Sequence, residues 1–466
     1  MVADRVGETP CVFLAGLHRA ERIIAERLMR IANGTLPWPW IDPDKALPWV
    51  AQRIGLALAE SQVAAIRLAL ISKVLVMTGG PGVGKTTIVR GILRILAAKG
   101  TNLLLCAPTG RAAKRMTEAT GFEAKTIHRL LEVDPKGGGF KRSDDNPLDC
   151  DLLVVDEASM VDVMLMQALM KALPDRAALL IVGDINQLPS VGPGQVLADV
   201  ISSGIVPVVR LTEVFRQAAQ SRIITSAHRI NQGSIPDLSP PGTESDFYFV
   251  QTDDPETAVG RVIELVKTRI PKRFGFDPIR DIQVLCPMNR GGVGARSLNI
   301  ELQAALNPAG DRKVERFGWT FAPSDKVMQI ENDYDKEVYN GDIGYIDDVD
   351  PNAGEIVASF DGRSVTYGFG ELDMLVPAYA TTIHKSQGSE YPAVIIPVLT
   401  QHYAMLQRNL LYTGVTRGKR LVVLVGQKQA IAIAVRNVSG RRRWSKLGEQ
   451  LAPKTPVSVD RRRVGR

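Results

Sequence analysis

The sequence predicts an α/β protein with two parallel, doubly wound sheets. Short apolar runs bounded by turn residues recur along the chain, and segments of helical character separate them. Such runs are typical of strands that are buried on both faces by crossover helices. They fall into two sets separated by the proline-rich stretch "GSIPDLSPPG" at residues 233–242, so we expect two such domains.

Five apolar runs make the first set. Before them, apolar residues recur at helical spacing over Cys11–Asn33 and Trp49–Leu70, with the Pro/Trp stop "GTLPWPWIDP" in between. We therefore expect an N-terminal helical segment over residues 1–58 and a first α/β domain over residues 59–235. Its strands are expected at residues 74–78, 103–107, 152–156, 179–184 and 206–211.

The second α/β domain is expected over residues 236–440, with strands at 282–287, 394–397 and 421–426. Residues 341–377 interrupt it. This stretch is rich in Gly, Asp and alternating β-formers with closely spaced turns, which predicts a small antiparallel β-barrel inserted into the domain.

Composition points to a soluble protein, with 45% apolar and 23% charged residues and no apolar run long enough to span a bilayer. No secretory signal opens the chain, and four scattered cysteines support neither a disulfide framework nor a zinc site, so we expect a cytoplasmic protein. Residues 441–466 contain nine Lys or Arg and two Asp or Glu, which accounts for the whole net charge of +7. We expect this tail to be disordered, acting either as a non-specific phosphate-binding arm or as a solubilising end.

The stretch "TGGPGVGKTT" predicts a P-loop, because it follows an apolar strand and opens a helix. Its backbone N–H groups are expected to wrap ATP phosphates, with Lys85 adding positive charge and Thr86 holding Mg²⁺. The nucleotide-binding candidates here are Gly79, Gly80, Pro81, Gly82, Val83, Gly84, Lys85, Thr86 and Thr87.

Two further strand ends complete this predicted site. "LLVVDEAS" delivers Asp156, expected to hold Mg²⁺, and Glu157, expected to orient or deprotonate the attacking water. "IVGDINQLPS" places Gln187 where it could contact the γ-phosphate and that water. Phosphoryl transfer also needs guanidinium groups, and Arg216 and Arg417 are the candidates if both face the cleft between the domains.

Taken in order, these motifs resemble those of superfamily 1 helicases, and most closely the RecD-like branch. The stretches that carry the resemblance include "TGGPGVGKTT", "APTGRAAKRM", "KTIHRLL", "VVDEASMVD", "VGDINQLPSVGPG", "RLTEVFRQ", "TTIHKSQGSEYP" and "LYTGVTRGK", and they cover residues 59–426. The resemblance implies two RecA-like domains with ATP between them and ATP-driven 5′→3′ movement on single-stranded DNA. About 58 residues precede the first motif, so the chain resembles the motor portion of the longer members.

The resemblance also implies roles for single residues. Gln62 matches the glutamine that reads adenine, Phe215 an aromatic near the base, Glu390 the acid at the ribose, and Arg216 and Arg417 the γ-phosphate arginines. His128 and His384 fit either DNA contacts or interior histidines. The DNA-contact candidates are Thr109, Gly110, Arg111, Thr126, His128, Phe140, Asn289, Arg290, Thr382 and His384.

The polar excursion at residues 132–147, "EVDPKGGGFKRSDDNP", occupies the slot where RecD-like helicases hold a β-hairpin pin. Leu131–Val133 could pair with Phe140–Arg142 across a turn at Lys136–Gly139, with Phe140 near the tip facing a terminal base pair. A flexible surface loop is the alternative, since three glycines loosen a short hairpin. The functional alternatives to a helicase are a translocase without strand separation, the helicase part of a conjugative relaxase system, and a non-hydrolysing DNA-binding subunit. The complete set of catalytic candidates speaks against the last.

Overall fold

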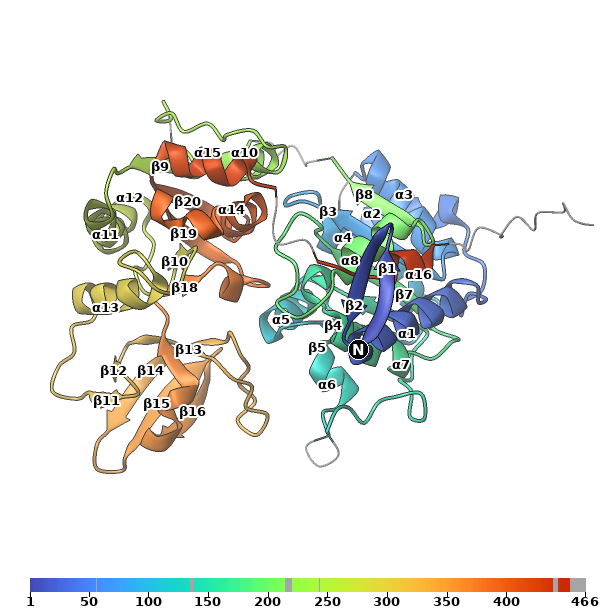
Figure 1. Cartoon of the computed structure of the whole chain (residues 1–466), viewed down its shortest axis with the longest axis horizontal. Coiled ribbons are helices and arrows are strands. Elements are labelled where there is room, and N and C mark those ends of the chain that lie inside the picture. Colours follow the sequence, from blue (N-terminus) through green and yellow to red (C-terminus); the bar gives the residue numbers. More distant parts are fainter. Residues whose placement is uncertain (56, 135–137, 214–219, 243, 439–442, 453–466) are drawn as a thin grey trace, which may run out of the picture.

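Two parallel sheets form the centres of two α/β domains, and a separate small β-domain extends below the second one (Figure 1). The computed structural model describes residues 1–466 except 56, 135–137, 214–219, 243, 439–442 and 453–466. The two predicted doubly wound sheets are confirmed.

The first sheet has six strands in the order β5-β4-β6-β7-β3-β8, all parallel. Each of the five apolar runs forms one strand, while the three-residue β5 lacks an apolar run that could have revealed it. The strands are β3 Val74–Gly79, β4 Leu103–Ala107, β5 Ala124–Thr126, β6 Leu152–Val155, β7 Ala178–Gly183 and β8 Val208–Leu211.

Helices bury both faces of this sheet. Val74 and Val76 of β3 enter one hydrophobic cluster and Leu75 and Met77 the other, because successive strand residues point to opposite faces. On the first face lie α1 Ala15–Ala32, α7 Val163–Ala172 and α8 Val196–Ser203, and on the second α2 Pro43–Ile54, α3 Glu60–Ile71 and α4 Lys85–Ala97. Three further helical elements follow the strand ends: α5 Gly110–Thr120, α6 Ile127–Leu131 and η1 Ala158–Met160.

The two ends of the chain differ from prediction. The expected N-terminal helical segment is preceded by a β-hairpin, β1 Val2–Val6 with β2 Thr9–Phe13, whose β-forming residues flank a turn at Gly7 with φ +57°. Within the expected disordered tail, Arg443–Ala452 is ordered against the first domain. Its helix α16, Leu447–Leu451, buries both leucines beside α1 and α8, which stabilises the contact by roughly 1.5–3 kcal/mol per side chain.

The second sheet has five parallel strands in the order β18-β10-β19-β20-β9. Helix α10 belongs to this domain, since Ile223, Ala227 and Ile230 are buried in its core, so the predicted boundary at residue 235 lies too late in the chain. The strands are β9 Phe247–Gln251, β10 Ile282–Cys286, β18 Ala380–Thr382, β19 Tyr391–Val398 and β20 Gly418–Gly426. The helical elements are α10 Arg222–Asn231, α11 Pro255–Glu264, η2 Leu265–Arg269, α12 Ile270–Phe274, α13 Ala295–Leu306, η4 His384–Ser386, η5 Thr400–Met405, α14 Arg408–Val415 and α15 Lys428–Arg436.

The β-domain begins earlier than the predicted 341–377. Val314 and Phe321 share its core with Val327 and Tyr367, so the segment before the predicted insert is part of the same unit. Its main sheet is antiparallel, in the order β16-β15-β14-β13-β17. Its elements are β11 Val314–Arg316, β12 Trp319–Phe321, β13 Lys326–Gln329, β14 Ile343–Asp350, β15 Glu355–Phe360, β16 Arg363–Gly368, η3 Phe369–Met374 and β17 Leu375–Pro377.

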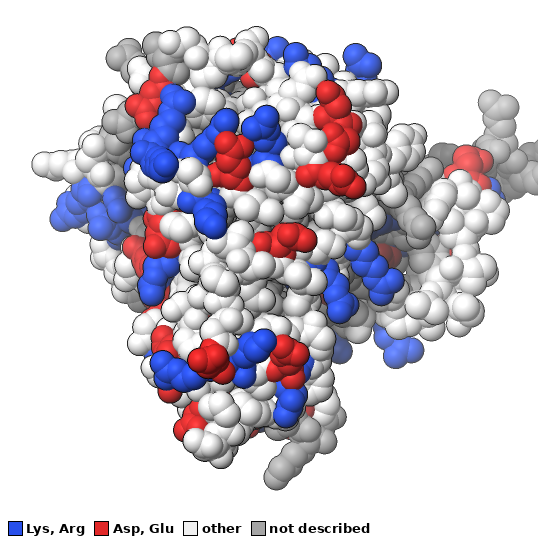
Figure 2. Space-filling view, turned by 90° about the vertical axis from the view of Figure 1, so that its left-hand side faces the viewer, with Lys and Arg blue, Asp and Glu red and all other residues white. Residues whose placement is uncertain are grey.

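The surface of the second domain and the β-domain carries both charge signs interspersed (Figure 2). This mixture agrees with a positive excess that lies in the C-terminal tail rather than in the body. Within the described ranges, none of the helices has the length and apolar character needed to cross a bilayer. All four cysteines are free thiols.

Candidate nucleotide-binding and DNA-binding sites

The P-loop is the turn between β3 and α4. Gly82 and Gly84 have φ of +75° and +83°, where L side chains are strained, and a Cβ on Gly79 would lie 2.8 Å from the Leu211 carbonyl oxygen. The glycines are therefore needed for this backbone path. Lys85 begins α4, and its Nζ donates hydrogen bonds to the carbonyls of Gly79 (2.6 Å) and Gly80 (2.9 Å), which holds the ammonium over the loop.

Asp156 and Glu157 follow β6 at the same sheet edge. Glu157 adopts a left-handed conformation, φ +49°, and its N–H donates to Asp156 Oδ1 at 2.8 Å. Burial, helped by the neighbouring Glu157 charge, raises the pKa of Asp156 to about 6. Burial alone would also raise the pKa of Glu157, but Arg115, Arg417 and Lys85 outweigh it and lower that pKa. The two carboxyls thus differ in their affinity for a proton.

Magnesium fits the donors that the structure places here. The Thr86 hydroxyl and the Asp156 carboxylate line the same cavity beside Lys85. Both are hard oxygen ligands of the kind that Mg²⁺ prefers, and Mg²⁺ needs only one or two of them because it keeps several waters. The residues present are therefore compatible with the expected ion.

The second domain supplies the opposite wall. Arg417, only 2% exposed, donates to the carbonyls of Thr413 (3.1 Å) and Ser389 (3.2 Å), which fixes its guanidinium between α14 and the segment that leads into β19. Gln187, after β7 of the first domain, is held through its Nε2 by Asp184 Oδ2 at 3.4 Å. Among the described residues its Oε1 is buried without a hydrogen-bond donor. A carboxamide oxygen in this position is available to a ligand.

One cavity of about 430 Å³ brings these groups together between the two domains. Gln62 does not line it, because its carboxamide is buried beneath the loop and bonded to the Ala59 N–H and the Val83 carbonyl, each at 3.0 Å. Phe215 and Arg216 lie outside the described residues. The predicted residues that do line it are Gly80, Pro81, Gly82, Gly84, Lys85, Thr86, Thr87, Asp156, Glu157, Gln187, Glu390 and Arg417.

Sequence reasoning missed Arg115, which lies on α5 and crosses the cleft. Its Nη2 contacts Glu157 Oε1 at 2.5 Å and its Nη1 contacts Glu390 Oε1 at 2.7 Å. Lys419 contacts the other oxygen of Glu390 at 3.3 Å. Arg115 therefore ties the predicted water-activating carboxylate to the second domain. The helical spacing of four residues from Arg111 was the available signal, since it places both on one face of α5.

The predicted DNA contacts at the start of α5 face the second domain and the β-domain. Thr109 caps the helix by accepting the Ala112 N–H at 3.2 Å. Arg111 donates to Ser389 Oγ at 3.0 Å and Tyr391 Oη at 3.2 Å. Gly110 lies against Tyr339, since a Cβ there would come within 3.3 Å of that ring. In this arrangement other parts of the chain partly cover the first three DNA candidates, each of which keeps intermediate exposure.

On the second domain, the DNA candidates gather at one sheet edge. β10 and β18 are parallel neighbours that end together at Cys286 and Thr382. The Thr382 hydroxyl accepts the Lys385 N–H at 3.3 Å, while Asn289 and Arg290 follow β10 and are exposed. These residues are accessible to a ligand along that edge.

Known relatives decide the family. An ATP-dependent RecD2 DNA helicase from Deinococcus radiodurans is 35% identical over 425 residues, which covers 91% of this chain and 56% of that protein. The RecBCD enzyme subunit RecD from Mycolicibacterium smegmatis is 32% identical over 433 residues, covering 84% of this chain and 75% of that subunit. This chain belongs to the RecD-like branch of the superfamily 1 helicases. It spans just over half the length of the RecD2 relative.

Three family profiles match separate parts of this RecD-like chain. They are an AAA domain at residues 62–193, a RecD-like DNA helicase SH3 domain at 298–360 and a UvrD-like helicase C-terminal domain at 377–425. The SH3 match overlaps the β-domain and also begins before residue 341. A crystal structure of Pif1 helicase from Bacteroides with ADP-AlF3 and single-stranded DNA matches 83% of this chain and 95% of its own, at 18% identity and a TM-score of 0.49.

Both histidine candidates of the RecD-like chain are half-buried. Burial lowers the pKa of His128 and of His384, which favours neutral rings near pH 7. The His128 ring lies 5.7 Å from the Phe140 ring. For His128 this packing favours the interior alternative. Thr126, next to it, is buried and caps α6 by accepting the Arg129 N–H at 3.1 Å.

The predicted pin pairs as expected at its base. Val133 pairs with Phe140, Lys141 N–H donates to the Glu132 carbonyl at 2.8 Å, and Arg142 N–H donates to the Leu131 carbonyl at 3.1 Å. Residues 135–137, which include the first half of the predicted turn, lie outside the described residues. Phe140 lies in the pair on the turn side of the hairpin, but it does not face outward as predicted, because its ring packs on the core of the first domain. A large aromatic side chain gains more free energy from that packing than from exposure.

Proposed function

We propose that this chain is an ATP-driven motor that moves 5′→3′ on single-stranded DNA and separates duplex at the hairpin of residues 131–142, the pin. The observation that carries the proposal is the single cavity lined by the P-loop of one domain and Arg417 of the other. A ligand held by both walls favours the closed arrangement of the domains, and its hydrolysis removes that preference. Cyclic closure is what a stepping motor requires.

The chemistry follows from the charges around the cavity. Lys85, Arg417 and Glu157 line the cavity. The two cations would neutralise charge on the transferred phosphoryl group, and Glu157 would orient the attacking water. Mg²⁺, held by Thr86 and Asp156, would supply further positive charge to the phosphate oxygens. Gln187 offers its free carboxamide oxygen to the same water. Each of these roles depends only on the chemistry of the side chain and on its position in the cavity lining.

Helix α5 supports a coupling between DNA and ATP. Its N-terminus carries the DNA candidates Thr109, Gly110 and Arg111, and one turn later Arg115 contacts Glu157. Helix N-termini hold phosphates through backbone N–H groups without reading base sequence. A strand bound at the start of α5 is therefore linked through a rigid helix to the residue expected to activate water.

Strand separation is assigned to the pin because its paired residues follow directly on α6 in the domain that carries the P-loop. Gly138, Gly139 and Lys141 are exposed, whereas Phe140 packs on the core, so these exposed residues rather than Phe140 would meet the duplex. The alternative, a translocase that does not separate strands, differs from the proposal only in this element.

Two measurements test the proposal. The rate of ATP hydrolysis should rise when single-stranded DNA is added and fall at least a hundredfold in Lys85→Ala. A hydrolysis rate that does not change when DNA is added would contradict the motor proposal. Forked duplexes with one tail type at a time test direction, and unwinding only from a 3′ tail would refute the polarity.

A pin variant separates helicase from translocase. Replacing residues 134–139 with Asn-Gly keeps the Val133–Phe140 pair and removes the exposed turn, since Asn-Gly favours a two-residue hairpin loop. We expect loss of unwinding with DNA-stimulated ATP hydrolysis within twofold of the unmodified chain. Unwinding at the original rate would show that strand separation does not depend on this turn, whereas absence of unwinding by the unmodified chain would favour the translocase alternative. The matched control is Lys141→Ala, which alters an exposed side chain and leaves the turn intact.

A further inference from the structure

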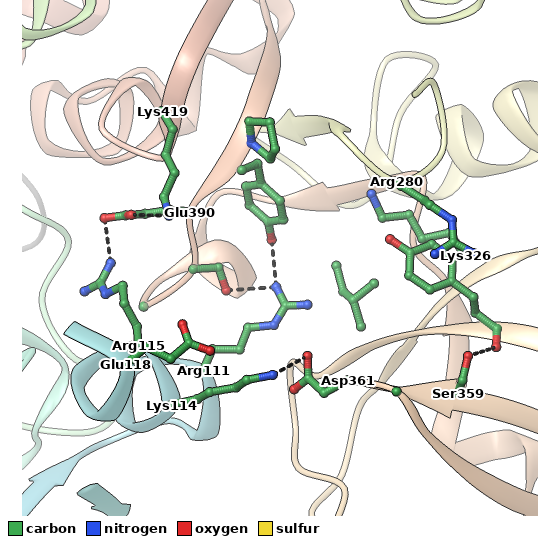
Figure 3. Close-up of a pocket in the computed structure, with 17 residues that line it drawn as sticks. Arg111, Lys114, Arg115, Glu118, Arg280, Lys326, Ser359, Asp361, Glu390 and Lys419 are labelled. Atoms are coloured by element: carbon green, nitrogen blue, oxygen red, sulfur yellow. Dashed lines mark hydrogen bonds and ion pairs between the residues drawn. The ribbon is translucent and has the colours of Figure 1, made fainter. Parts of the chain in front are cut away.

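A second cavity, of about 550 Å³, lies beside the nucleotide cavity at the junction of α5, the β-domain and the second domain (Figure 3). The two cavities share Arg115, Glu390 and Lys419 in their linings. Its volume falls within the usual range for small-ligand sites. No role proposed above uses this space.

The lining is strongly cationic. Six Lys or Arg side chains face three acidic ones, Glu118, Asp361 and Glu390. Lys114 pairs with Asp361 at 2.9 Å, and Glu390 is shared between Arg115 and Lys419. The remaining cations have no carboxylate within 4 Å among the described residues; they are Arg111, Arg280 and Lys326.

These three cations make only neutral contacts. Arg111 donates to the Ser389 and Tyr391 hydroxyls. Arg280 lies over the Tyr345 ring, with its guanidinium carbon 4.9 Å from the ring centre. Lys326 is 2% exposed, and its Nζ donates to the Ile282 carbonyl at 3.1 Å. Figure 3 shows Arg280 of the second domain close to Lys326 of the β-domain on one side of the cavity, with Arg111 entering from α5.

A buried ammonium without a counter-ion is costly, and proteins normally pair or neutralise it. Burial, with a contribution from Arg111, lowers the pKa of Lys326 to about 7, and the charges of Asp277 and Asp281 offset only part of this shift. An anion placed between the three cations would remove this penalty. Guanidinium groups bind phosphate oxygens in a bidentate manner, and lysine adds a point charge.

We propose that this cavity is a second phosphate-binding site, separate from the P-loop, that takes the phosphate groups of a small polyanion. The shared lining with the nucleotide cavity makes phosphate that enters or leaves that cavity one source. The backbone of bound DNA is the other source, since Arg111 is a predicted DNA contact.

The test uses the full chain carrying Lys85→Ala, which disables the P-loop, and titrates it with inorganic pyrophosphate in a calorimeter at low salt. We expect saturable binding that weakens at least tenfold when Arg280→Gln and Lys326→Met are added. The matched control is Lys267→Gln with Lys272→Gln, two exposed cations of the second domain outside the cavity. Lys326→Arg keeps the charge and should retain binding, while melting temperatures confirm folding.

A second arm measures binding of a twelve-residue oligothymidylate to the same variants. An unchanged DNA affinity beside lost pyrophosphate binding supports the site and identifies free phosphate as its source. A parallel loss of DNA affinity, with a reduced salt slope, supports the site and identifies the DNA backbone. Absence of pyrophosphate binding in the Lys85→Ala chain, or binding that survives loss of Arg280 and Lys326, would overturn the proposal.

Discussion

The nucleotide cavity and the DNA-facing surface of this RecD-like chain are built in different ways. Most residues predicted for the cavity converge on one space, and they come from strand ends and the turn after β3. The residues predicted for DNA are divided among an exposed edge of the second domain, the region of α6 and the pin, and the start of α5, which other domains partly cover.

The two sets of residues differ in the part of the structure that determines their position. Strand ends of a parallel sheet meet at one edge, so a motif after a strand determines its own location. Helix caps and loops instead depend on what packs against them. Phe140 illustrates this, since its place in a glycine-rich segment predicted exposure, yet the first-domain core holds it. The predictions below test whether the residues of the nucleotide cavity act in catalysis and whether those of the DNA-facing side act mainly through packing.

The largest effect is expected at the cavity wall of the second domain. Arg417→Lys should lower kcat of ATP hydrolysis by about a thousandfold, because a lysine cannot reproduce a guanidinium fork at the transition state. Steady-state kinetics with single-stranded DNA measure it. Arg420→Ala, an exposed neighbour on β20, is the control and should change kcat less than twofold. Equal losses in both would mean that the region acts through folding.

Arg115 connects the two regions, and its loss should have an intermediate effect. Arg115→Gln removes the ion pairs to Glu157 and Glu390, so we expect kcat to fall about tenfold with a smaller change in KM. Arg115→Lys should retain part of the kcat that is lost in Arg115→Gln, since the positive charge remains. Lys114→Gln, the neighbouring cation, serves as the control. A loss of DNA affinity with unchanged kcat would assign Arg115 to the DNA side instead.

Phe140→Ala tests the structural character of the pin base. The half-buried ring contacts His128 and the first-domain core, so we expect the free energy of unfolding of this domain to fall by about 1–2 kcal/mol. Thermal melting would show a shift of a few degrees. ATP hydrolysis well below the melting temperature should stay near its original rate. An unchanged melting temperature with lost unwinding would restore the predicted base-pair-facing role.

The smallest effect is expected where the β-domain meets the first domain. Arg129 pairs with Glu337 at 3.0 Å beside Tyr339, and both side chains are about half exposed. Such a pair contributes little stability, so Glu337→Gln should leave melting unchanged and strengthen DNA binding about two- to threefold by freeing Arg129. Fluorescence anisotropy with labelled oligonucleotides measures it. Glu315→Gln on β11 is the control, and weaker DNA binding in Glu337→Gln would show that Glu337 orders the binding surface.

The sequence by itself determined the two sheets, the P-loop and the order of the catalytic motifs. Apolar runs need burial on both faces, and Gly82 and Gly84 are needed for the backbone path before Lys85. These constraints are local, so they can be read from consecutive residues. The five apolar runs of the first domain became strands for this reason.

Only the tertiary structure decided which distant groups meet. Leu447 and Leu451 form a docked helix within a tail of high charge, because the first domain offers α1 and α8 to bury them. α10 joins the second domain through Ile223 and Ala227, although it precedes the proline-rich stretch. Arg115 links the two domains because the fold places Glu157 and Glu390, 233 residues apart in the sequence, within ion-pair distance of its guanidinium. Packing free energy and ion pairing act between residues that sequence order separates, so no local pattern could reveal them.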